Sequence, residues 1–103
     1  MKFLRFSMMD VDKVAQVVQA SDKLWSSPPP GVKMLANYAC LGIAFPGEPP
    51  NTIVSVSIVE AENAEAIGAT SYPTALAGAA VWNVPVMEVP VAGAAEVEKK
   101  LRR

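Results

Sequence analysis

The chain has 103 residues, with 9 basic and 10 acidic side chains and a net charge of −1 at pH 7. This length fits one domain, and the balanced charge gives no electrostatic footprint for nucleic acid. The sequence contains no histidine. That absence excludes Ser/His/Asp and Cys/His triads, histidine-ligated zinc or haem, and any imidazole acid or base.

Hydrophobic residues make up 51% of the sequence and charged residues 18%. We therefore expect some apolar surface to lie against a partner, for which a second copy of the chain is the simplest choice. Cys40 is the single cysteine, so no intrachain disulfide can form and a reducing, cytoplasmic location is expected. Residues 1–13 and 75–95 are interrupted by charged residues or prolines, which predicts neither a secretion signal nor a membrane span.

The first predicted element is a strand over residues 2–9, KFLRFSMM. Its uniformly apolar positions, Leu4, Phe6 and Met8, alternate with a mixed set, Phe3, Arg5 and Ser7. Asp10 is expected to cap a helix whose apolar stripe includes Val14, Val18 and Trp25. The helix should end near Ser26, because the following prolines in SSPPPG cannot continue it.

A β-hairpin is predicted next. Residues 32–45, VKMLANYACLGIAF, resume the two-residue period of a strand. The turn sequence PGEPPN then leads into a further strand in NTIVSVSIV, which begins at Asn51.

The second helix is predicted to start at an Asn63 cap and to be the weakest element. Gly68, Pro73 and Gly78 all disfavour it, so we expect a kink or break close to Tyr72 and Pro73.

The last strand is predicted in residues 83–92, NVPVMEVPVA, followed by a short helix in GAAEVEKKLRR. Pro85 and Pro90 lack the N–H group that a central strand needs, which restricts this strand to a sheet edge. The predicted order is strand, helix, strand, strand, helix, strand. This order indicates one ferredoxin-like α+β domain over residues 1–103, with a four-stranded antiparallel sheet and the last strand beside the first.

Two helices can cover only one face of such a sheet. The uniformly apolar positions are predicted to lie under the helices, namely Leu4, Phe6, Met8, Val54, Val56, Ile58, Met87 and Val89. The opposite, mixed face is predicted to pack against the sheet of a second copy, enclosing its polar side chains between the two sheets.

The chain resembles the dimeric α+β barrel superfamily. The resemblance spans nearly the whole sequence and is carried by PPPGVKML, VEAENAEAI and VWNVPVMEVPV. More narrowly, the chain is similar to a family of short barrel proteins of unknown function. The resemblance implies a homodimer. The superfamily includes cofactor-free monooxygenases, lactone isomerases, haem enzymes and ligand-sensing domains, of which the haem enzymes usually need an axial histidine that is missing here.

Five polar residues of the mixed face are the candidate ligand-binding residues: Arg5, Asn37, Ser55, Ser57 and Glu88. Arg5 and Glu88 are expected on adjacent strands, either as a structural ion pair or as an anion anchor beside a general base whose pKa is raised by burial. Without histidine, Ser55 and Ser57 are better suited to hydrogen bonding in a pocket than to nucleophilic catalysis. No metal or cofactor is predicted.

Three functions remain open at this point. The favoured one is a homodimeric module that binds a small, partly apolar ligand between its two sheets. The alternatives are a cofactor-independent monooxygenase or isomerase that uses Arg5 and Glu88, and a purely structural dimer or assembly component. No nucleic-acid or membrane partner is expected.

Overall fold

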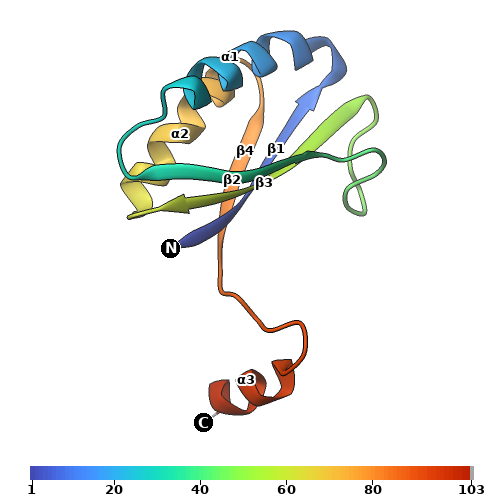
Figure 1. Cartoon of the computed structure of the whole chain (residues 1–103). Helices are drawn as coiled ribbons and strands as arrows, with labels where there is room; N and C mark the ends of the chain where they lie inside the picture. The colour runs from blue at the N-terminus through green and yellow to red at the C-terminus, as the bar shows by residue number, and fades with distance from the viewer. Residues whose placement is uncertain (103) are drawn as a thin grey trace.

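A computed structural model of the protein describes residues 1–102 (Figure 1). In chain order the elements are β1 (Lys2–Asp10), η1, a 3₁₀ turn (Val11–Lys13), α1 (Val14–Ser26), β2 (Val32–Ala39), β3 (Thr52–Ala61), α2 (Ala64–Leu76), β4 (Ala80–Val86) and α3 (Ala94–Leu101).

The four strands form one sheet in the order β2-β3-β1-β4, and every neighbouring pair is antiparallel. Helices α1 and α2 lie on the same side of this sheet (Figure 1). The predicted ferredoxin-like βαββαβ order is therefore confirmed, as is the position of the last strand at the edge beside β1.

Three predicted boundaries differ from the structure. Strand β2 ends at Ala39 and the loop that follows continues to Asn51. Strand β4 begins at Ala80 and ends at Val86, which pairs with Lys2, the first residue of β1. Helix α3 falls within the predicted last helix, whose final residue, Arg103, lies outside the described residues.

The predicted break in the second helix is wrong, because α2 continues through Pro73 to Leu76. Proline removes the N–H that would have bonded to the carbonyl of Ala69, but Ala69 is exposed, so water can satisfy that group. Thr70 and Thr74 flank the proline and both accept hydrogen bonds from Arg5, which holds the helix on either side of it.

The predicted cap of α2 is confirmed. The Asn63 side-chain oxygen accepts a hydrogen bond from the backbone N–H of Ala66 at 2.8 Å. Replacing Asn63 by Ala should lower the free energy of unfolding by about 1 kcal/mol, since one N–H at the helix start loses its partner. Urea denaturation would measure this loss, and Asn63→Asp, which keeps an acceptor, should retain most of the stability. An equal loss in both variants would contradict the capping role.

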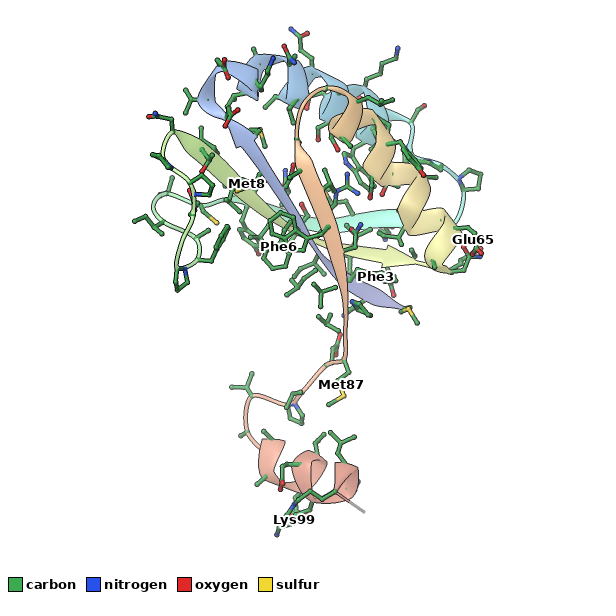
Figure 2. All side chains as sticks on the ribbon, turned by 180° about the vertical axis from the view of Figure 1, so that it is seen from behind. Phe3, Phe6, Met8, Glu65, Met87 and Lys99 are labelled. Atoms are coloured by element: carbon green, nitrogen blue, oxygen red, sulfur yellow. The ribbon has the colours of Figure 1, made fainter. Side chains whose placement is uncertain are left out.

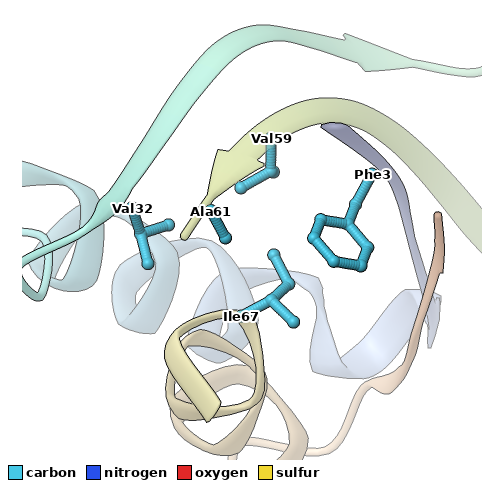
Figure 3. Close-up of a cluster of buried hydrophobic side chains, with 5 residues drawn as sticks. All are labelled: Phe3, Val32, Val59, Ala61 and Ile67. Atoms are coloured by element: carbon cyan, nitrogen blue, oxygen red, sulfur yellow. The ribbon is translucent and has the colours of Figure 1, made fainter. Parts of the chain in front are cut away.

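Two clusters of buried apolar side chains join the sheet to its helices. The larger one contains Phe3, Val32, Val59, Ala61 and Ile67 (Figure 3). The smaller one contains Met9, Val17 and Ala79. Phe3 and Met9 mark the side of β1 that the helices cover.

The predicted assignment of the two sheet faces is therefore wrong. Along β1 the buried residues are Phe3, Arg5, Ser7 and Met9, while Leu4, Phe6 and Met8 are only partly buried. The mixed face lies under the helices because α2 supplies hydrogen-bond acceptors for Arg5. The alternation of apolar and polar residues along β1 cannot indicate these acceptors.

The uniformly apolar face is on the other side of the sheet, and we call it the open face. Phe6 stacks on Trp82 there with ring centroids 5.3 Å apart, and Phe45 from the β2–β3 loop packs edge-on against the same indole at 6.5 Å. Figure 2 labels Phe6 and Met8, two of its members. The open face comprises Leu4, Phe6, Met8, Val54, Val56, Ile58, Trp82 and Val84.

Residues 87–102 leave the domain and end in α3, which stands apart from the sheet (Figure 1). Several apolar side chains in this tail are exposed, including Met87, Val89, Val91 and Leu101. Of the helices in the described chain, none has the length and apolar character needed to cross a membrane.

Candidate ligand-binding site

A pocket of about 360 Å³ lies between α1 and the covered face of the sheet. Its buried floor contains Arg5, Ser7 and Ser57. Apolar side chains form the walls: Val14, Val17, Val18 and Trp25 from α1, and Met9, Met34 and Ile53 from the sheet. Asp22 and Asn37 also line the pocket and are exposed, which places them at its mouth beside the edge strand β2.

Four of the five candidate residues from the sequence line this pocket. The strand register explains why, because Ser57 of β3 pairs with both Arg5 of β1 and Asn37 of β2, while Ser55 pairs with Ser7. Directly paired residues project to the same face of a sheet. The structure thus brings Arg5, Asn37, Ser55 and Ser57 together, but under the protein's own helices.

The fifth candidate, Glu88, lies elsewhere. It follows the end of β4, is exposed, and forms an ion pair with Lys2. That hydrogen-bonded pairing lowers the pKa of Glu88 and raises the pKa of Lys2. Both the expected Arg5–Glu88 pair and the expected rise in the Glu88 pKa are therefore wrong, because the register of β4 places Asn83 opposite Arg5 and leaves Glu88 near Lys2.

Replacing Glu88 by Gln should leave both the stability and any ligand binding unchanged. The pair with Lys2 is exposed to solvent, where such pairs contribute little. Titration of a ligand against both proteins would check this. A clear loss of affinity in the variant would place Glu88 in the site after all.

Arg5 is the most extensively bonded side chain of the pocket. Its Nη1 donates to the Thr70 hydroxyl at 2.7 Å, and its Nη2 donates to the Thr70 carbonyl at 2.7 Å and the Thr74 hydroxyl at 3.2 Å. Nη1 also lies 3.5 Å from the Ser71 hydroxyl. The guanidinium carbon is 5.8 Å from the centroid of the Trp25 ring, within range of a cation–π contact.

All of these acceptors are neutral. In the described part of the chain, no acidic side chain forms a salt bridge with Arg5. Burial lowers the pKa of Arg5 to about 10, so the guanidinium still carries its proton at pH 7. The pocket floor therefore holds a full positive charge that the chain itself does not neutralise.

Other polar groups of the pocket are only partly satisfied. The Ser57 hydroxyl donates to Asn37 Oδ1 at 2.9 Å, and the Asn37 amide N–H groups have no hydrogen-bond partner among the described residues. The Ser7 hydroxyl is buried, with 8% of the residue exposed, and has no partner there either. Buried polar groups normally find a partner, and the Ser7 hydroxyl is one that finds none among the described residues.

The sequence reasoning missed several residues of the site. Ser7 was placed on the same face as Arg5 but was not selected as a candidate. Thr70 and Thr74 are buried on α2, one turn apart, and their polar spacing on the buried side of a helix was the available signal. Trp25 was predicted as part of the apolar stripe of the first helix, and its ring also lies 5.8 Å from the guanidinium carbon of Arg5.

Within residues 1–102, no group of three or more Cys, Asp or Glu side chains is placed to hold a metal ion. The pocket itself offers one carboxylate, that of Asp22, beside hydroxyl and amide groups.

No family model matches the sequence, and no curated protein matches it significantly. Among solved structures, the chain is similar to the crystal structure of a DUF3240 family protein from Shewanella baltica OS155, with 16% identity and a TM-score of 0.49. The match covers 89% of this chain and 97% of the other. Neither the identity nor the TM-score is high enough to transfer a function.

Proposed function

We propose that the protein is a homodimer that binds a small, partly apolar ligand in the pocket beneath α1, with one site in each subunit. The observation that carries the proposal is a pocket of about 360 Å³ with apolar walls and a buried polar floor. This volume lies within the range of roughly 300 to 1,000 Å³ that is usual for small-molecule sites.

The location differs from the site expected between two sheets, because the polar residues face α1. A ligand would enter beside the edge strand β2, past Val18 and Asn37, and reach Arg5 and Ser7 at the floor. The unpaired hydroxyl of Ser7 supports such an occupant, since a bound molecule can supply the missing partner.

The enzyme alternative has less support. It required Glu88 as a general base beside Arg5, and Glu88 is bonded to Lys2 at the surface. Asp22 is the acidic side chain that lines the pocket, and it lies exposed at the mouth. A binding role needs no such base and is therefore preferred.

Self-association is supported by two unpartnered apolar surfaces on the same chain, the open face and the tail that leads to α3. Trp82 and Val84 of the open face are 37% and 42% exposed, and Met87 and Val89 continue the apolar surface beyond β4. Two copies that pack through their open faces would cover both sheets, in an interface of roughly 1,200 to 2,000 Å² in total.

The ligand site can be tested with small probes and ¹H–¹⁵N NMR. We expect 3-phenylpropionamide and 3-phenylpropionate to shift the signals of pocket residues in the wild-type protein. Val18 is 48% exposed at the mouth, so Val18→Trp should fold normally while obstructing entry and weakening binding at least about tenfold.

Leu76→Trp is the matched control, because Leu76 is an exposed residue of α2 outside the pocket. It should bind the probes as the wild type does. Shifts that are spread over the surface, or that persist unchanged in Val18→Trp, would refute binding in the pocket.

A further inference from the structure

We infer that the ligand of this pocket is a small monocarboxylate with an apolar tail, whose carboxylate binds at the floor beside Arg5 and Ser7. This inference rests on the proposed function and specifies the class of ligand. Four features of the pocket carry it.

The first feature is the unneutralised charge of Arg5. The residue is 4% exposed, and its terminal N–H groups bond only to hydroxyl and carbonyl oxygens of α2. Neutral acceptors solvate a cation but leave its charge in a region of low dielectric, where charges are usually paired. An anionic group in the pocket would supply the missing counter-charge.

The second feature is the presence of donors without partners at the floor. The Ser7 hydroxyl lacks a partner among the described residues, and no hydrogen bond there involves the Arg5 Nε–H. Hydroxyl and N–H groups can all donate to a carboxylate, which accepts through about four lone pairs. A neutral amide or alcohol ligand would satisfy fewer of them.

The third feature is that the floor carries a single positive charge. One carboxylate neutralises Arg5, whereas a dianion such as a phosphate monoester would leave a net negative charge buried in the pocket. The acidic residue of the pocket, Asp22, stands exposed at the mouth and would add to the repulsion of a second anionic group.

The fourth feature is the apolar wall. Val17, Met9 and Ile53 line the pocket beside the polar floor, and Trp25 covers it from α1. These side chains favour a hydrocarbon tail, aliphatic or aromatic, whose burial would contribute about 25 cal/mol for each Å² removed from water.

The test compares matched acid and amide pairs that share one tail: hexanoate with hexanamide, cyclohexanecarboxylate with its amide, and 3-phenylpropionate with 3-phenylpropionamide. Affinities are measured by NMR titration of the full chain. We expect each carboxylate to bind roughly 10- to 100-fold more tightly than its amide, since hydrogen bonds to a charged group are the stronger ones.

The variant Arg5→Met keeps the length of the side chain and removes its charge. It should bind the amides as the wild type does and lose the preference for carboxylates. Ser7→Ala, which leaves Arg5 in place, should reduce the affinity for carboxylates several-fold more than the affinity for amides, and it serves if Arg5→Met fails to fold.

The outcomes separate the two proposals. Equal binding of acids and amides would overturn the carboxylate inference and leave the pocket as a ligand site. Tighter binding of 3-phenylpropylamine than of 3-phenylpropionate would overturn it as well. It would indicate that the carboxylate of Asp22, rather than Arg5, determines which charge the pocket prefers. Failure of every probe to bind in the pocket would refute the proposed function together with the inference.

Discussion

Replacing Val84 by Asp is expected to weaken the proposed homodimer at least about 100-fold, which corresponds to a loss of roughly 2.7 kcal/mol. Val84 lies on the open face opposite Leu4 and is 42% exposed, so the subunit can accept a charge there. In a dimer formed through the open faces, the same carboxylate would be buried in both subunits without a partner, which is costly. Sedimentation equilibrium would measure the change.

Val11→Asp is the matched control. Val11 is 55% exposed in the turn before α1, away from the open face, so the same chemical change there should leave the dimer intact. A wild-type protein that is monomeric at concentrations of about 10 μM would contradict the proposed dimer. Equal weakening by both variants would place the interface elsewhere.

The order and pairing of the strands could be predicted from the sequence because they depend on local signals. The proline run after Ser26 ends α1, Asn63 caps α2, and Pro85 agrees with a strand at the sheet edge. Each of these acts through backbone geometry within a few residues, which the sequence displays directly.

The side of the sheet on which the helices lie could not be predicted in the same way. A strand with one uniformly apolar and one mixed face suggests that the apolar face is covered, and here the open face is the apolar one. The deciding contacts join Arg5 to Thr70 and Thr74, which are 65 and 69 residues further along the chain. The pattern of residues around Arg5 cannot predict acceptors that lie so far along the chain.

The candidate site was grouped successfully for a reason that does not depend on the face. Ser57 pairs directly with both Arg5 and Asn37 in the sheet. The three side chains therefore lie together on one face, whichever face the helices cover. Glu88 does not belong to the group because the register places Asn83, five residues earlier, opposite Arg5, and β4 ends at Val86.

Replacing Thr70 by Val is expected to lower the free energy of unfolding by about 1.5 to 3 kcal/mol, because a buried charged donor loses its nearest side-chain acceptor. Thr70 is fully buried and its hydroxyl lies 2.7 Å from Arg5 Nη1, while the Ser71 hydroxyl, at 3.5 Å, is too distant to replace it. Valine has nearly the same shape as threonine, so packing changes little. Urea denaturation would measure the loss.

A double-mutant cycle with Arg5→Met separates this contact from other roles of Thr70. In the Arg5→Met background, Thr70→Val should cost much less, because the remaining hydrogen bond of the Thr70 hydroxyl is a local one to the Ile67 carbonyl of the same helix. The same cost in both backgrounds would show that Thr70 stabilises α2 independently of Arg5. A large coupling would instead mean that α2 holds the guanidinium in place, and it would explain how a strand residue carries a fixed positive charge at the floor of the pocket.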